Sequence, residues 1–474
     1  QSVVFNEIQY HPASEDRREE FIELYNRGRA PINLAGWRLT SGVSFTFPDV
    51  TLMPGGFLVV ASDADVFRAK HPGAGPVVGN WAGALSNRGD RLDLVDARGN
   101  RVNSVTYADE GEWAVRRRSR QWTGFYTWDW YAEHDGLGKS LELIDPYRPN
   151  DCGQNWAASL AADGTPGTTN SVFSRAAVPF VQEVKHHPAV PRPTDQVVVT
   201  ARVADTDTSG LRVYAHHRVD GEADFAVLEM RDDGAHGDGL ASDGVYGAVL
   251  PSQPRDTIVE FYVRAVNGQG AERLWPAAPV PPGTPRANLL YQVDEAGETS
   301  AMPLYRLLMT AADRQYFLDV IGDYHGRFSD AEHPAAFFSV INGQVEVRQL
   351  ASLRNRGQGS RFLDVPNFHV SLRSDELWHA VDKINLNCDY PHVELLGNAI
   401  CQIAGFPVAE SRAVQVRLNG QNPSTPGHFR YGIYTHDEAT DADFARHHGL
   451  GSSNIYRCMR RSGTQAADLA YRGP

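Results

Sequence analysis

Alternation of apolar and polar side chains is the feature that most constrains the fold of this chain. In the stretch 197–203, Val197, Val199, Ala201 and Val203 occupy every second position. Because successive side chains of a strand point to opposite faces, these four residues share one face. Similar short runs recur along the chain, and the 43 Gly and 28 Pro residues favour many turns between them. We therefore expect a mainly β protein, with two antiparallel β-sandwiches followed by an α+β lobe.

Residues 1–172 form the first predicted domain. Strand-like runs such as 3–10 and 57–62 are separated by turns, for example at 54–56. Five blocks follow in order between Val3 and Asn170: EEFIELYNRGRAPINLAGWRLTSG, TFPDVTLMPGGFLVVASD, GKSLELID, NWAAS and GTPGTTN. These blocks resemble the lamin-tail domain in its bacterial, secreted form. The resemblance implies an immunoglobulin-like β-sandwich without a catalytic centre.

An aromatic insert at 110–136 interrupts this pattern. It places tryptophans and other aromatic rings beside a run of arginines. Such residues together form protein-protein hot spots or stack on sugars and bases. We predict an interaction surface for a protein or glycan partner, formed by Trp122, Trp128, Trp130 and Arg117. The alternative is that the rings cover one open end of the sandwich while the arginines lie in solvent.

The segment 231–247, RDDGAHGDGLASDGVYG, places four aspartates among five glycines. Glycine disfavours regular helices and strands, and several carboxylates on a flexible loop suit the oxygen-rich coordination of Ca²⁺. We therefore predict a structural calcium site formed by Asp232, Asp233, Asp238 and Asp243. The alternative is an acidic hairpin turn solvated by water.

This acidic loop lies in the second predicted domain, residues 178–295. The strands of this domain alternate strongly, and its loop has the pattern DDG-x-HGDG-x-x-x-DG-x-Y. Both features resemble the immunoglobulin-like modules of bacterial exported proteins. The resemblance implies a second immunoglobulin-like sandwich with a structural, extracellular role.

Residues 299–474 form the third predicted region. A helix is expected to open at Thr310, and a second helical period places Val393, Leu396, Ile400 and Ile403 on one face. The blocks SLRNRGQGSRFLDVPNFHVSLR, KINLNCDYPHVELLGNAICQIAGFPVAESRAVQVRLNG and YGIYTHDEATDADFARHHG resemble the amino-terminal part of the spore-coat CotH kinase family. This resemblance implies an atypical protein kinase that uses Mg-ATP on secreted or surface proteins. The metal-holding and catalytic residues of that family lie in a further lobe, and no position of this chain matches them.

The turn after residue 353 is the candidate anion site of this region. Arg354, Arg356 and Arg361, with the backbone of Gly357 and Gly359, provide guanidinium and amide donors for a phosphate. The alternative is a β-hairpin turn with solvated arginines. No catalytic residue is assigned.

Charge and composition narrow the function classes. A net charge of −13 argues against a general nucleic-acid surface, and the sequence has no apolar run of 18 residues that would span a membrane. Strand-like sequence begins directly after Gln1, which is typical of a chain after removal of a signal peptide and predicts an extracellular or cell-surface location.

Two functions of different class remain: a non-catalytic adhesive or scaffolding protein, and a secreted CotH-type kinase whose catalytic lobe lies beyond residue 474. The oligomeric state, the pairing of the four cysteines and a kinase substrate are not readable from these residues.

Overall fold

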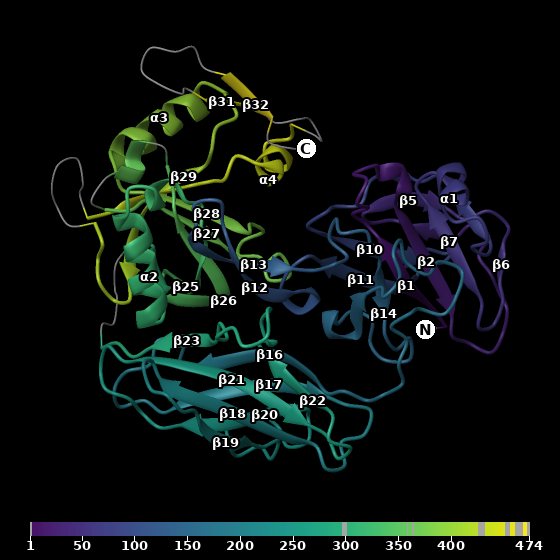
Figure 1. The fold of residues 1–474 in the computed structure, drawn as a ribbon, viewed down its shortest axis with the longest axis horizontal. Coiled ribbons are helices and arrows are strands. Elements are labelled where there is room, and N and C mark those ends of the chain that lie inside the picture. Colours follow the sequence, from purple (N-terminus) through teal and green to yellow (C-terminus); the bar gives the residue numbers. More distant parts are fainter. Residues whose placement is uncertain are drawn as a thin grey trace.

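The structure is a computed structural model of the 474-residue chain. It describes residues 2–295, 301–357, 359–362, 365–424 and 432–450, together with the backbone of two later strands, β31 (Tyr456–Met459) and β32 (Asp468–Tyr471). The strands form two β-sandwiches and a β-barrel, with a separate hairpin lying among them (Figure 1). The expectation of a mainly β protein is confirmed.

The first sandwich packs a six-stranded sheet against a five-stranded one. The order of the first sheet is β15-β14-β1-β2-β7-β8 and that of the second is β11-β10-β4-β5-β9. The strands of the first sheet are β1 (Val3–Gln9), β2 (Phe21–Asn26), β7 (Phe57–Ala61), β8 (Val77–Gly79), β14 (Leu141–Leu143) and β15 (Trp156–Ala158). Those of the second are β4 (Arg38–Leu39), β5 (Val43–Thr46), β9 (Ala82–Gly83), β10 (Gly89–Val95) and β11 (Arg101–Ala108). A short pair, β3 (Ile32–Asn33) and β6 (Thr51–Leu52), and one helix, α1 (Ala64–Lys70), complete the unit.

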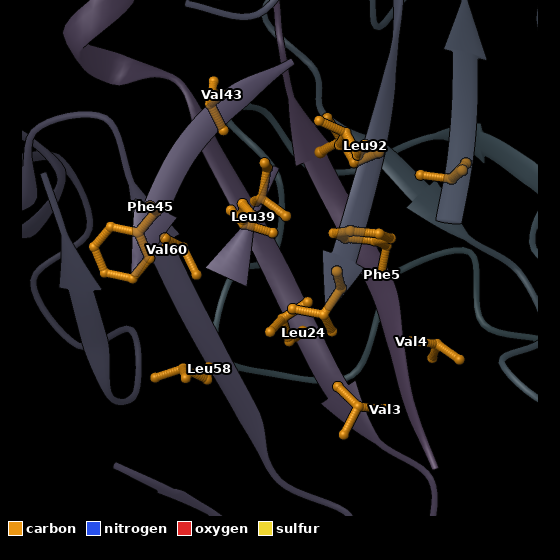
Figure 2. Packing of buried hydrophobic residues seen from close by; sticks show 14 of the residues in the cluster. Val3, Val4, Phe5, Leu24, Leu39, Val43, Phe45, Leu58, Val60 and Leu92 are labelled. Atoms are coloured by element: carbon orange, nitrogen blue, oxygen red, sulfur yellow. The ribbon is translucent and has the colours of Figure 1, made fainter. Parts of the chain in front are cut away.

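The core of this sandwich lies between its two sheets. Figure 2 shows Phe5 and Leu24 of one sheet beside Leu39 and Leu92 of the other, all of them buried. Strand β14 pairs with β1, so the chain returns to the first sheet after the insert. The insert therefore leaves the sandwich after β11 and rejoins it at β14, and its Trp113 packs against the core of this sandwich.

The second sandwich has a three-stranded sheet, β16-β17-β20, facing a sheet in which β18 and β21 are central. Its strands are β16 (Phe180–His187), β17 (Val197–Ala204), β18 (Arg212–Val219), β19 (Ala226–Met230), β20 (Val245–Leu250), β21 (Ile258–Val266), β22 (Glu272–Trp275) and β23 (Leu289–Gln292). Val197, Val199, Ala201 and Val203 are all buried on one face of β17, which confirms the alternation argument.

The third unit is a closed seven-stranded barrel in the order β24-β25-β26-β27-β28-β30-β29. Its strands are β24 (Leu304–Leu308), β25 (His333–Ile341), β26 (Gln344–Asn355), β27 (Phe368–Ser371), β28 (Lys383–Asn387), β29 (Ser411–Leu418) and β30 (Tyr434–Asp437), and its helices are α2 (Ala311–Gly322), α3 (Pro391–Ile403) and α4 (Ala442–His447). The barrel closes because β29 returns parallel to β24. Strands mixed with helices were expected here, but closure depends on a pairing about a hundred residues apart, which no local pattern encodes.

The two expected helices of this unit differ in how they pack. Thr310 caps α2 by accepting a hydrogen bond from the Asp313 amide at 3.1 Å, as its sequence predicts. The apolar stripe of α3 instead faces outward, with Leu396 63% and Ile403 88% exposed. Within the described residues, no helix is long and apolar enough to cross a membrane.

Candidate functional site at the junction of the three units

The hairpin formed by the insert lies where the two sandwiches and the barrel meet (Figure 1). It consists of β12 (Val115–Arg120) and β13 (Tyr126–Tyr131), paired antiparallel. The main chain of β12 exchanges two hydrogen bonds with Val280 of the second unit, from Arg118 N to Val280 O at 3.0 Å and from Val280 N to Arg116 O at 2.8 Å. The hairpin thus extends the main-chain bonding of one unit into another.

The opposite strand of the hairpin bonds to the barrel. Trp128 N donates to Glu332 O at 2.9 Å, and Glu332 N donates to Thr127 Oγ1 at 2.9 Å. The Tyr126 amide donates to the Tyr316 hydroxyl of α2 at 2.7 Å. Each strand of the hairpin therefore bonds to a different neighbouring unit through its backbone.

Trp128 and Arg116 fill the space between these contacts. The Trp128 ring is 7% exposed and belongs to the apolar core of the second sandwich, against which Trp130 also packs. The Arg116 guanidinium is buried, lies 5.0 Å from the Trp130 ring centroid, and donates to Ser352 Oγ of the barrel at 3.1 Å. Burial lowers the pKa of Arg116 from its ordinary value. Contact with aromatic faces partly offsets the loss of water around this cation.

The four residues of the predicted interaction surface therefore lie in three different environments. Trp122, at the tip of the hairpin, is 88% exposed. Arg117 is half-exposed and pairs with Asp129 at 2.7 Å, while Trp130 is partly buried. Trp128 is enclosed by other units of the same chain, so it is not accessible to an outside partner. The rings of the insert are divided between two units, because Trp128 and Trp130 pack on the core of the second sandwich while Trp113 packs against the core of the first.

The segment just before the hairpin, which holds Glu110 and Glu112, makes a second contact with the barrel. The Glu112 amide donates to Asp375 Oδ2 at 2.9 Å, and Arg373 holds the same carboxylate at 2.8 Å. The Ser374 amide donates to Glu110 Oε2 at 2.9 Å. Burial raises the pKa of Glu110 to about 8, since its carboxyl group has few charged partners to compensate for lost solvent.

Gly111 is required at this contact. Its φ is +67°, in the left-handed range that favours glycine, and a Cβ on this residue would clash with the carboxylate of Asp375. A side chain at this position would push the barrel away from the first sandwich.

The second sandwich and the barrel also touch directly. Gln349 and the main chain of Leu290 exchange hydrogen bonds of 3.0 and 2.8 Å, and the buried Arg306 pairs with Asp294 at 2.6 Å. An apolar cluster that includes Leu290 and Phe338 lies beside these bonds. The first and second sandwiches are joined in the same manner, because Gln154 exchanges hydrogen bonds of 2.6 and 2.9 Å with the main chain of Val181.

A cavity of about 940 Å³ lies at this junction, lined by residues of all three units. Its wall includes Glu112, Lys185, Gln349, Arg373 and Glu376. The sequence does not reveal this cavity, because its lining comes from segments more than 250 residues apart.

The acidic loop of the second sandwich is closed by its own hydrogen bonds. Asp238 is buried and accepts from the amides of Gly234 and His236, at 2.8 and 3.1 Å. Asp232 accepts from the amides of Asp243 and Gly244, at 3.1 and 2.9 Å. A hydrogen bond from His236 lowers the pKa of Asp233, which it contacts at 2.8 Å.

These aspartates do not form a preorganised cation site. The loop is described throughout, and no three of Asp232, Asp233, Asp238 and Asp243 bring ligand oxygens within 4.8 Å of one another. An ion would have to draw the carboxylates together against the turns that they now close. Calcium binding by this loop stays a prediction.

The predicted phosphate-binding turn also uses its cations within the protein. Arg354 pairs with Asp330 at 3.1 Å, and Arg361 contacts the same carboxylate and donates to Gly357 O at 2.7 Å. Arg356 donates to Asn387, whose amide in turn contacts Glu394 and Asp437. Gly357 adopts φ +107° and Gly359 begins a 3-10 turn that runs to Phe362. The three arginines thus have carboxylate or carbonyl partners within the protein, and phosphate binding stays a prediction.

The first sandwich has the two-sheet arrangement expected from the resemblance, and comparison with protein-family models agrees. Residues 1–109 match the family model of the Lamin Tail Domain. In the structure, the first sheet of this sandwich continues beyond the matched residues through β14 and β15. A search of curated proteins gave no match. The lamin-tail domain is compatible with a structural or scaffolding module.

Proposed function

We propose that this protein is a non-catalytic scaffolding protein of the cell surface or extracellular space, in which the β12–β13 hairpin holds the three units in one arrangement. The observation that carries the proposal is the position of Trp128. The Trp128 side chain of the hairpin packs in the core of the second sandwich. The backbone of the same residue donates a hydrogen bond to the barrel.

The contacts support a fixed arrangement of units. Interfaces between freely moving domains are small and polar, whereas this junction combines main-chain bonds, a buried arginine and shared apolar clusters. A scaffold needs this property, since it must present surfaces at constant spacing. The exposed Trp122 at the hairpin tip is the residue of the predicted interaction surface that is available to a protein or glycan partner.

The export part of the proposal rests on the resemblance of the first two domains to modules of secreted proteins. It is tested by fractionating the producing cells and treating intact cells with protease. We expect the protein in the medium or at the surface, where protease degrades it without cell lysis. Recovery only from the cytoplasm, protected from protease, would contradict the proposal.

The second candidate function is a secreted CotH-type kinase that uses Mg-ATP. The observation that favours it is the outward apolar stripe of α3, with Leu396 and Ile403 exposed, because such a stripe is expected to pack against a further structure. Arg356, with Asn387, Glu394 and Asp437, provides a charged cluster near the start of this helix. Burial and, to a smaller extent, the neighbouring Asp437 together raise the pKa of Glu394 to about 7.

Incubation of the chain with labelled ATP and Mg²⁺ or Mn²⁺ separates the two functions. We expect no transfer of label to the protein itself, because phosphoryl transfer needs metal-holding carboxylates and a group that positions the nucleophile. Label that is incorporated by the wild type and lost in Arg356→Ala would favour the kinase. The matched control is Arg212→Ala, which changes an exposed arginine on the second sandwich.

A further inference from the structure

A cluster of two histidines and a glutamate lies where the end of β30 meets the end of α4. Glu438, His447 and His448 bring ligand atoms to within 4.8 Å of one another. His447 Nδ1 lies 2.8 Å from Glu438 Oε1, and His448 Nε2 lies 3.0 Å from Glu438 Oε2. We propose that these three residues form a binding site for a divalent transition metal ion, with zinc as the expected ion.

The backbone holds each of the three side chains in place. Glu438 follows β30, and its amide donates to Glu410 O at 2.9 Å while its carboxylate accepts from the Glu410 amide at 3.2 Å. His447 is the last residue of α4, and the His448 amide donates to Phe444 O at 2.9 Å. The His448 ring also packs on the buried Phe444, with centroids 4.3 Å apart. The donor atoms are therefore positioned by a strand end and a helix end.

His447 and His448 are adjacent in sequence, and their side chains converge because α4 ends at His447. Neighbouring residues of a strand point to opposite faces, and His216 and His217 of β18 lie in that arrangement. At the end of α4, in contrast, both imidazoles turn toward one carboxylate. This convergence cannot be read from the letters HH in the sequence.

The donor types select the class of metal. Two imidazole nitrogens with one carboxylate are a common ligand set for Zn²⁺, whereas Ca²⁺ and Mg²⁺ prefer oxygen ligands alone. The other ring nitrogen of His447, Nε2, lies 3.7 Å from Glu410 Oε1. Carboxylates near the second nitrogen of a ligating histidine orient the ring and increase its basicity, so Glu410 is a positioning residue for this site.

The site borders a cavity of about 550 Å³. Its lining includes Glu438 and His447 of the cluster, together with Trp378, Lys383 and Arg412. Three protein ligands leave a fourth position of a tetrahedral zinc ion open. In this protein the open position is next to the cavity, where water or an anion attracted by Lys383 and Arg412 would complete the coordination.

The proposal is tested with the full chain after metal has been removed by chelation. Cobalt is added first, because four-coordinate cobalt absorbs visible light, and zinc is then titrated while the absorption is followed. We expect about one equivalent of cobalt to bind and zinc to displace it. Absence of stoichiometric binding, or an absorption typical only of hydrated cobalt, would overturn the proposal.

Variants locate the site. His447→Ala and His448→Ala are expected to abolish stoichiometric binding, and Glu410→Gln to weaken it by about 10- to 100-fold, as for other residues that orient a ligand. His325→Ala, at an exposed histidine outside the cluster, is the matched control and is expected to bind as the wild type. Unchanged binding in the double variant of His447 and His448 would contradict the assignment, and circular dichroism of each variant verifies that the fold is retained.

Discussion

The Arg116 guanidinium of the hairpin donates two hydrogen bonds of 3.1 Å to Ser352 Oγ of the barrel, across 236 residues of sequence. The same guanidinium faces the rings of Trp128 and Trp130, at 5.8 and 5.0 Å from their centroids. One buried side chain of the first unit thus bonds to the third unit while it packs on rings that extend the core of the second. The arrangement of the whole chain depends on contacts of this kind.

Removal of the hydroxyl at position 352 is expected to destabilise the protein. In Ser352→Ala the buried guanidinium loses an acceptor, and an unsatisfied buried donor costs about 1–3 kcal/mol. Urea unfolding measures this difference. In the background Arg116→Met the donor is already absent, so Ser352→Ala should then cost much less, and equal costs in both backgrounds would contradict the importance of the bond.

The two tryptophans of the hairpin are expected to respond very differently to truncation. Trp128→Ala leaves a cavity in a shared core and should cost about 3–5 kcal/mol in the free energy of unfolding. Trp122→Ala, at an exposed tip, is the matched control and should change stability by less than about 0.5 kcal/mol. Similar losses in the two variants would show that Trp128 is not part of the core.

The stability of the protein is expected to depend on pH through Glu110. Burial raises its pKa from the ordinary value of 4.5 to about 8 in the folded chain. The folded state therefore holds a proton that the unfolded state has lost, so this contribution is complete below about pH 4.5 and disappears as the pH rises toward about 8, at about 1.4 kcal/mol per pH unit.

Urea unfolding between about pH 5 and pH 9 measures this dependence. Glu110→Gln keeps an acceptor for the Ser374 amide but cannot ionise, so it should flatten the decline. Glu183→Gln, at an exposed glutamate, is the control and should decline as the wild type does. An unchanged slope in Glu110→Gln would contradict the role assigned to this carboxyl group.

The melting temperature tests the calcium site predicted for the acidic loop. Because Asp232 and Asp238 would have to release the backbone amides that they now accept, binding should be weak and the melting temperature should rise only at millimolar calcium. We expect this rise to be lost in Asp238→Asn, and an unchanged melting temperature between chelator and millimolar calcium would contradict the predicted site.

Patterns within a single strand or helix were enough to predict which residues form that element. The alternation at Val197 and Val199 identified a buried face, and Thr310 marked the start of α2, because both signals lie within one element. Helical periodicity correctly located α3 but did not reveal that Ile403 faces outward, since periodicity does not say what covers a face.

The candidate sites could be predicted only in part, because they depend on contacts distant in sequence. The composition of the insert predicts a contact surface, but composition does not tell whether Trp128 meets another molecule or another part of its own chain. The cluster of Glu438, His447 and His448 was missed, since it forms only when β30 and the end of α4 are brought together.

Scanning calorimetry of the whole chain tests most directly whether the hairpin joins the three units. Val115 and Tyr131 are paired at the base of the hairpin, so residues 115–131 can be replaced by a short Gly-Ser turn that leaves the lamin-tail domain connected. We predict one cooperative unfolding transition for the wild type and separate transitions for the variant. Separate transitions at the same temperatures in both proteins would contradict the claim that the hairpin holds the units together.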